Sequence, residues 1–577
     1  MRRLALALLA ATVALAGCTG VPLSSRPQVI ETIGGGQGSP ASPPGPAPGA
    51  EPRAIVSGFL VNNAASDAHH NAARTYLTTE ANNRWSDATV TIVEDPRVSN
   101  PDAQNRVTVT GELIGTVDAS GIYSGSQVIG SGGVIKTATF ALRKVDGQWR
   151  IDSLQNGLII SYAQFQAYYT QRTVYFYDQD EQRLVPDPRF TALQDFGQLA
   201  TWLMAQLVGG ARPELQDATK TELPAQADPR RVTATTGAVL KIDIPGASQL
   251  AAATRSRLAA QVALTLEPVL FAGEASIIDG GRPVEIPVVG SAQFGVANFA
   301  DLLAPTVTDP GLYYLNTNGA IVDADGDPLP GPLGSGAYHF ASFALAAAGG
   351  ARGGSGMYAA GTVGASGNQH LYVGRSDALL HQVPGVSGQL SRPAWAPFRS
   401  EVWVASGPSL YRVGLTGAAR PIPVTAGGDK VAGTIRAVRL SPEGARVALV
   451  TQNSEGVGQI WLGSVIRSGD AVQVGDLRLI SPAGASITDV AWNDALKLFA
   501  VGRNINGAAN VYELQSDGSL WTARGTPNLP AAPDNITVAQ HVVAAVQAAN
   551  SVWVQSGGSW GSPSSGTAHG TSPAYVE

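Results

Sequence analysis

The stretch Arg439-Leu440-Ser441-Pro442-Glu443-Gly444-Ala445-Arg446-Val447-Ala448-Leu449-Val450 decides the fold of the largest part of this chain. Two short apolar runs flank a polar segment that contains Pro442 and Gly444, the residue types that mark tight turns. A second pair of runs, Asp489–Trp492 and Lys497–Val501, repeats the arrangement further along. The sequence therefore predicts β-hairpins that recur, which is typical of a repeat domain.

Short strands that carry an aromatic residue recur over the same region. They are Leu312–Leu315, His370–Val373, Ser409–Val413, Gln459–Leu462, Asn510–Leu514 and Ser551–Val554. A spacing of about 40–60 residues leaves room for about four short strands per unit, which is the size of one propeller blade. The Arg439–Val450 hairpin resembles the Ser-Pro-Asp-Gly hairpin of many propellers. We expect five or six blades over residues 306–577, with a β-sandwich as the alternative.

Aromatic side chains occupy the same place in successive units: Tyr372, Tyr411, Trp461, Tyr512 and Trp553. Such residues could line a binding face. A place that repeats with the unit is better explained by packing of one blade against the next. We therefore expect these side chains to belong to the core.

Residues 52–170 form the first of two smaller modules. Helical patterns come first, and strand-like runs follow at residues 88–93, 106–111, 137–142 and 148–151. Asp146-Gly147, between the last two runs, is a hairpin signal. Helices followed by antiparallel strands resemble the cone-shaped NTF2-like α+β domains. Some members of that class use Asp and His chemically, but His69 and His70 lie in a polar stretch here, and we expect them to be solvated.

Residues 171–304 form the second module. A strand over residues 172–178 precedes a helix that we expect to stop at Gly209-Gly210 with a left-handed cap, and a second helix is expected over residues 249–266. The runs VYFYD, LVPDPR, LVGGARPEL, LTLEPV and IIDGGRPV resemble the GerMN domain. That resemblance implies an α+β module that has no catalytic residues and binds partners or wall components.

The chain begins with the parts of a secretory signal: Arg2-Arg3, a short apolar run, and small residues before Cys18, the one cysteine in 577 residues. Leu15, Ala16, Gly17 and Cys18 resemble the lipobox of bacterial lipoproteins. The resemblance implies removal of residues 1–17, a diacylglyceryl group on the Cys18 sulfur and an acyl group on its amine. Residues 18–51, rich in Pro and Gly, are expected to be a tether, so that the bilayer is reached through the acyl chains on Cys18.

The composition excludes some classes of function. A net charge of −6 and the lack of a Lys/Arg cluster argue against nucleic acid as a partner. Gly557–Gly561 matches a nucleophile-elbow pattern, but no helical pattern follows it, and no acidic residue lies between it and His569. Asp323–Asp327 alternates carboxylates as a calcium loop does, yet Pro328 stands where that loop needs glycine. We expect an acidic turn there, no catalytic residues, no metal and no cofactor.

Three modules in this order after a lipobox resemble the LpqB family of actinobacterial lipoproteins. The resemblance implies two α+β domains followed by an all-β propeller, held at the outer face of the cell membrane by lipid. It also implies a non-enzymatic protein that binds the extracytoplasmic domain of a two-component sensor histidine kinase and modulates its signalling to cell division and envelope maintenance. The alternative is an envelope lipoprotein that binds or processes cell-wall glycan, with wall polymer as its partner.

Overall fold

A computed structural model describes residues 45–64, 70–125, 135–228, 234–235, 239–270, 273–303, 310–347, 356–425, 433–482, 484–540, 542–564 and 568–577. Residues 45–577 form one compact unit. Two α+β modules are followed in it by an all-β propeller, which confirms the predicted fold class. None of the helices in these residues is long and apolar enough to cross a membrane.

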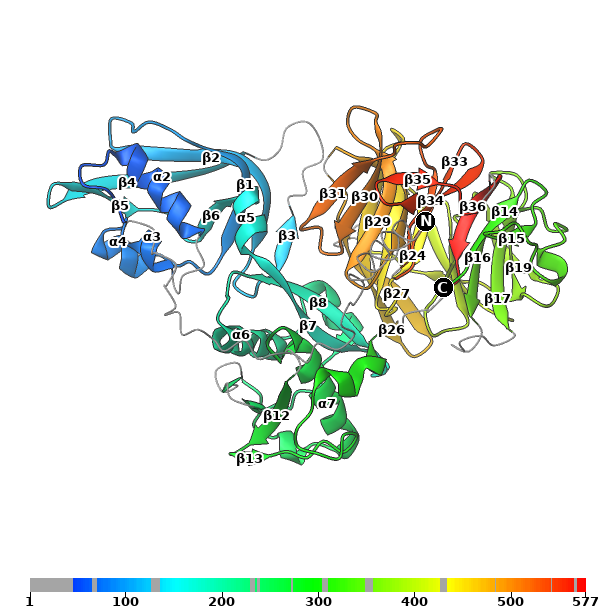
Figure 1. Cartoon of the computed structure of the whole chain (residues 1–577), viewed down its shortest axis with the longest axis horizontal. Coiled ribbons are helices and arrows are strands. Elements are labelled where there is room, and N and C mark those ends of the chain that lie inside the picture. Colours follow the sequence, from blue (N-terminus) through cyan, green and yellow to red (C-terminus); the bar gives the residue numbers. More distant parts are fainter. Residues whose placement is uncertain are drawn as a thin grey trace, which may run out of the picture. The chain divides into compact units, whose positions relative to one another are not determined.

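The first module packs helices against a curved sheet (Figure 1). Its helices are α2 (Pro52–Asn63), α3 (Asn71–Arg74), α4 (Thr79–Arg84) and, after the sheet, α5 (Tyr162–Tyr168). Its strands are β1 (Val90–Val98), β2 (Arg106–Val117), β3 (Tyr123–Gly125), β4 (Ile135–Val145), β5 (Gln148–Ser153) and β6 (Leu158–Ser161). They pair in the order β5-β4-β2-β1-β6, with β3 beside β2 and β6 parallel to β1.

Two local features explain why this module folds as the sequence predicts. Asp146 and Gly147 both have positive φ, 51° and 77°, as a two-residue hairpin turn with the favoured twist requires. Phe59 on α2 is fully buried, and its ring lies 5.4 Å from that of Trp85 and 5.9 Å from that of Phe140. The helix therefore covers the sheet through aromatic edge-to-face contacts.

The second module places two main helices beside two small sheets. The helices are α6 (Phe196–Gly209), α7 (Ala252–Thr265) and α8 (Glu267–Leu270), with 3-10 turns at Pro213–Ala218, Ala247–Gln249 and Val296–Leu302. The strands are β7 (Thr170–Asp178), β8 (Leu184–Thr191) and β9 (Thr219–Lys220), and then β10 (Ala234–Thr235), β11 (Val239–Asp243), β12 (Glu274–Asp279) and β13 (Arg282–Pro283). The first sheet has the order β8-β7-β9 and the second β10-β11-β12-β13.

The helix ends of the second module differ slightly from prediction. Gly210 has the expected positive φ of 91°, but its ψ of 172° is extended, so the chain leaves α6 directly and does not form a left-handed cap. The second helix starts at Ala252, because residues 247–249 form a separate 3-10 turn after Gly246. A tight turn between β12 and β13 is formed by Gly280 and Gly281, with φ of 58° and 80°.

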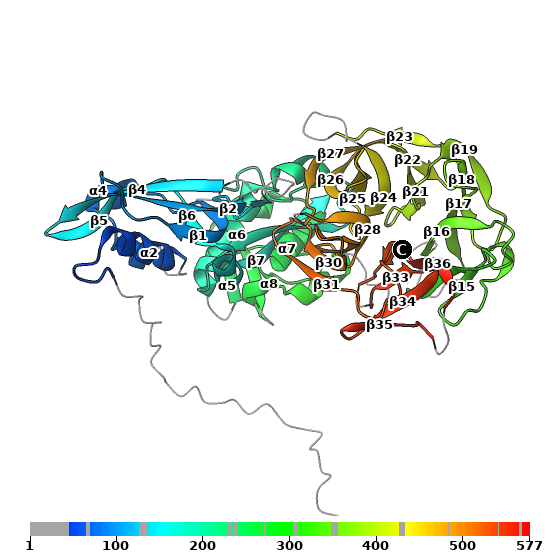
Figure 2. The same cartoon turned by 90° about the horizontal axis from the view of Figure 1, so that it is seen from above.

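The propeller contains six sheets in the described residues, and Figure 2 shows them around a common centre. Blade 1 is β15-β14-β36, and blades 2 to 6 are β16–β19, β20–β23, β24–β27, β28–β31 and β32–β35. The strands of the first three blades are β14 (Leu312–Asn316), β15 (Ile321–Asp323), β16 (Phe340–Ala347), β17 (Met357–Val363), β18 (Gln369–Arg375), β19 (His381–Gly388), β20 (Ala394–Trp395), β21 (Glu401–Ser406), β22 (Ser409–Gly414) and β23 (Arg420–Ile422). Those of the last three, with the closing strand, are β24 (Thr434–Leu440), β25 (Arg446–Gln452), β26 (Gly458–Ser468), β27 (Ala471–Leu479), β28 (Ser486–Trp492), β29 (Lys497–Arg503), β30 (Ala509–Gln515), β31 (Trp521–Gly525), β32 (Asn535–Thr537), β33 (Ala545–Ala548), β34 (Ser551–Ser556), β35 (Ser559–Gly561) and β36 (Gly570–Tyr575).

A separate apolar core lies between each pair of neighbouring blades, including the last and the first. Of the recurring aromatics, Tyr512 is buried in one of these cores, whereas Tyr372, Tyr411, Trp461 and Trp553 are partly buried and pack against them. Indole nitrogens reinforce two of the seams, because Trp395 Nε1 donates to Ala344 O and Trp492 Nε1 to Arg439 O. The ring is closed by β36, which pairs antiparallel with β14.

Candidate functional site

The residues predicted to carry the lipid, Leu15 to Cys18, lie outside the described part of the chain, as does His69. His70 has a left-handed backbone at the start of α3. Gly49 N donates to Gln148 Oε1, so the segment just before α2 lies on the first module. Among the described residues no group of three or more His, Cys, Asp and Glu side chains could hold a metal ion.

The two motifs that imitate functional loops are turns. Gly557–Gly561 lies in the β34–β35 hairpin, and Ser559 Oγ donates to Ser556 O, so the pattern lacks the strand-turn-helix of a nucleophile elbow. Asp323 Oδ1 accepts the backbone N–H groups of Asp325 and Asp327, at 3.0 and 2.9 Å. This carboxylate is used to hold an acidic turn, as the sequence predicts.

A buried cluster of charged side chains joins the first two modules. Asp187 and Arg189 lie on β8, a strand buried along its whole length, and Arg189 Nη2 donates to Asp187 Oδ2 at 2.7 Å. Asp187 has a second neighbour, Arg212, whose backbone N–H donates to the same Asp187 oxygen at 2.8 Å. The side chains of Asp187, Arg189 and Arg212 are exposed by 0%, 2% and 5%.

Both arginines reach backbone carbonyls of the first module. Arg189 Nη1 donates to Ser120 O at 3.3 Å, and Arg212 Nη2 donates to Tyr123 O at 3.1 Å. Phe190 adds an apolar contact, because its buried ring lies 5.0 Å from that of Phe165 in the first module's core. The buried Asp187 carboxylate therefore holds the Arg189 guanidinium and the Arg212 backbone, and both arginine side chains bind backbone carbonyl oxygens of the neighbouring module.

The propeller joins the same region through Arg478 on β27. Its guanidinium lies 3.6 Å from Glu214 Oε1 and donates to the carbonyl oxygens of Ser516 and Asp517. Burial, and after it the charge of Arg212, lowers the pKa of Arg478 to about 10. We call Tyr123, Asp187, Arg189, Arg212, Glu214 and Arg478 the module junction.

Sequence reasoning did not identify the module junction. The run Leu184-Val185-Pro186-Asp187-Pro188-Arg189 contained one signal, since an acid and a base two residues apart in a strand share one face. Nothing in the sequence shows that this face is covered by another module. The described structure thus uses these buried charged groups to join modules.

Fold and junction together define a class of protein: a multidomain chain in which two α+β modules and a six-bladed propeller form one compact unit. Three family descriptions match it in order, "Lipoprotein LpqB, N-terminal domain" over residues 45–166, "Sporulation and spore germination" over 173–278 and "Lipoprotein LpqB beta-propeller domain" over 319–576. This chain belongs to the LpqB lipoprotein family.

Two relatives show how far the similarity extends. Lipoprotein LpqB of Mycolicibacterium smegmatis is 31% identical, over 82% of this chain and 81% of the relative. Lipoprotein LpqB of Mycobacterium ulcerans is 29% identical, over 91% of each chain. Among solved structures, TolB from Acinetobacter baumannii matches 36% of this chain and 45% of its own length, at 15% identity and a TM-score of 0.25.

Proposed function

We propose that this chain is a lipid-anchored, non-enzymatic protein on the extracytoplasmic face of the cell membrane that binds a two-component sensor histidine kinase. By binding the kinase's extracytoplasmic domain it modulates signalling to cell division and envelope maintenance. The observation that carries the proposal is membership of the LpqB lipoprotein family over all three modules. The lipobox ending at Cys18 supports the anchor.

The lipid anchor and the module junction both fit the role of a protein that binds a membrane kinase. Acyl chains on Cys18 hold the protein near the bilayer, which raises its effective concentration at the outer domain of a membrane kinase. Residues 45–577 form one compact unit, which the module junction helps to join, so a partner can contact more than one module at once. Modulation requires unequal affinity for two states of the kinase, because a protein that binds both states equally shifts neither.

The anchor is tested by Cys18→Ser. We expect the variant to fold normally but to leave the membrane fraction, because serine lacks the thiol that is alkylated. Fractionation after metabolic labelling with a palmitate analogue measures both effects, and an unchanged melting temperature shows that the fold is intact. Labelling of the variant would contradict the anchor.

The partner is tested with the intact chain, because deleting a module would expose the buried charges of the junction. We place the kinase contact on the first two modules and treat the propeller as a scaffold. One variant carries aspartate at three exposed apolar positions of the first two modules: Val61, Ile135 and Val288, exposed by 65%, 63% and 66%. A matched variant carries aspartate at three exposed apolar positions of the propeller: Leu379, Ile505 and Val543, exposed by 79%, 66% and 50%.

Each protein is used to capture membrane extract, and histidine kinases are identified by mass spectrometry. The sensor domain of the captured kinase is then purified and titrated, with autophosphorylation as the readout of modulation. We expect the first variant to lose capture and the propeller variant to keep it. Capture that fails only with the propeller variant would overturn the division of labour, and enrichment of wall polymer without any kinase would favour the glycan-binding alternative.

A further inference from the structure

A cavity of about 330 Å³ lies where the β7–β8 hairpin of the second module meets the propeller. The propeller side is formed by the β20–β21 turn, by the hairpin that contains Glu443 and by β26. Its volume falls at the lower end of the range of small-molecule sites, roughly 300–1,000 Å³. We propose that this cavity binds a small zwitterion, namely an amino acid or dipeptide with an apolar side chain. The proposal goes beyond the kinase contact and does not depend on it.

One side of the cavity carries negative charge that the protein leaves incompletely paired. Glu443 has a fully buried side chain, and its Oε1 accepts from Arg446 Nε at 2.8 Å, whereas its Oε2 is buried without a hydrogen-bond partner. An unpaired buried carboxylate oxygen is costly, and a charged N–H donor relieves it most strongly. Because Glu443 lines the cavity, its carboxylate charge favours an ammonium group there.

Asp178 adds a second carboxylate to the lining. Its Oδ1 accepts the backbone N–H groups of Gln182 and Arg183, at 2.7 and 3.0 Å. Burial raises the pKa of Asp178, so its ionised form is short of stabilising partners. An ammonium group in the cavity would stabilise that form.

The opposite charge is supplied by Arg467 on β26. Arg467 Nη2 donates to Glu401 Oε1 at 2.9 Å, and Arg412 Nη1 donates to the other oxygen of the same carboxylate at 3.0 Å. One carboxylate thus serves two guanidinium groups, and a positive charge remains. Arg467 lines the cavity with a side chain that is 13% exposed, so a ligand carboxylate would find a partly desolvated partner.

The apolar wall explains why an uncharged ligand side chain is expected. Leu440, Val465 and Phe398 line the cavity. Phe398 has a φ of 61°, a conformation that bulky residues rarely adopt, and it is 52% exposed with the Arg183 guanidinium 4.4 Å from its ring centre. A strained, half-exposed aromatic that lines a charged cavity is typical of a binding site.

The balance of charges selects the ligand class. The lining holds three acids, Asp178, Asp180 and Glu443, and three arginines, Arg183, Arg399 and Arg467, of which Arg399 and Asp180 pair with each other. A ligand of one sign would meet repulsion as well as attraction. A zwitterion places its ammonium group by Glu443 and Asp178, and its carboxylate by Arg467.

The test is calorimetric titration of the full chain in detergent with L-leucine and glycyl-L-leucine. Two close analogues serve as ligand controls: N-acetyl-L-leucine lacks the ammonium group, and L-leucinamide lacks the carboxylate. We expect binding of leucine or the dipeptide at millimolar concentrations or below, with each analogue weakened by about tenfold or more. No binding of either zwitterion, or equal binding of the analogues, would overturn the proposal.

Three variants tie that binding to this cavity. Glu443→Gln should weaken binding by about tenfold or more, whereas Glu513→Gln, which alters an ion pair elsewhere in the propeller, should not. If Glu443→Gln fails to fold, Asp178→Asn replaces it, because an amide oxygen can still accept the two backbone N–H groups. Phe398→Gly should leave the melting temperature unchanged or higher, since glycine relieves the strained φ, yet weaken binding. Full affinity in these variants would place the ligand elsewhere and overturn the inference.

Discussion

Replacing Asp187 by alanine should lower the free energy of unfolding by roughly 3–5 kcal/mol. Asp187 is completely buried and accepts from Arg189 Nη2 and from the backbone N–H of Arg212. Alanine would leave the Arg189 guanidinium buried without its carboxylate and would remove the acceptor of the Arg212 backbone N–H. Removing one partner of a buried pair costs more than the pair itself is worth, because the remaining charge is uncompensated. Urea titration followed by fluorescence and circular dichroism measures the loss.

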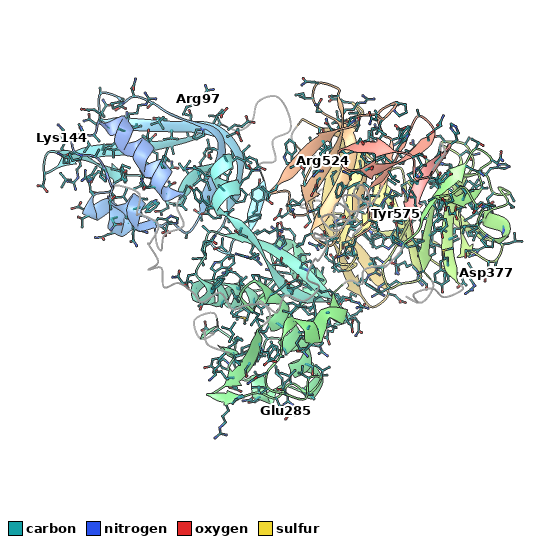
Figure 3. The ribbon with its side chains drawn as sticks, in the orientation of Figure 1. Arg97, Lys144, Glu285, Asp377, Arg524 and Tyr575 are labelled. Atoms are coloured by element: carbon teal, nitrogen blue, oxygen red, sulfur yellow. The ribbon has the colours of Figure 1, made fainter. Side chains whose placement is uncertain are left out.

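Asp377→Ala is the matched control for that measurement. Arg375 and Asp377 have the same two-residue separation as Asp187 and Arg189 but are 51% and 58% exposed. Figure 3 shows Asp377 at the outer surface of the propeller. We expect no measurable change in stability, because water solvates whichever charge is left. Equal effects of the two substitutions would mean that the junction is solvated in solution.

Replacing Gly570 by valine should open the ring of blades. Gly570 begins β36, and a Cβ there would collide with the carbonyl oxygen of Leu315 and the ring of Tyr314 on β14. The backbone cannot move aside as a flexible side chain can. We therefore expect the free energy of unfolding to fall by about 3 kcal/mol, the upper part of the usual range for overpacking. We expect a lower melting temperature and faster proteolysis within the propeller.

Gly561→Val provides the control for the ring. Gly561 ends β35 in the neighbouring blade, and a Cβ there would have no atom within 4 Å. Both changes add the same side chain to a strand glycine, so a difference in stability reports the crowded seam between β14 and β36. If both variants melt like the parent protein, the seam does not limit the stability of the propeller.

Much of the fold could be predicted because local sequence patterns determine its strands and turns. The aromatic strands of the propeller recur with the blade, and the turns at Asp146-Gly147 and Gly280-Gly281 need only neighbouring residues. The number of blades could not be settled that way. Blade 1 is assembled from β14, β15 and β36, which lie at opposite ends of the repeat region, and no local pattern joins them.

The module junction escaped prediction for a related reason. Asp187 and Arg189 read as ordinary strand residues, and their burial depends on a loop of the first module about 70 residues away, through Ser120. The cavity beside Glu443 is likewise built from the second module and the propeller together. Contacts between modules depend on the shape and charge of folded surfaces, and a single sequence does not show which surfaces meet. Cys18 is the opposite case, since a local motif identifies it, and its lipidation stays a prediction.

The pairing of β36 with β14 also determines the order in which the protein folds. Chains fold from the N-terminus as they emerge, so both α+β modules and most of the blades can form early. The edge of β14 that pairs with β36 stays unpaired until β36 is synthesised, more than 250 residues later. During that interval the edge could pair with another chain. The step most exposed to aggregation is therefore the final closure of the propeller.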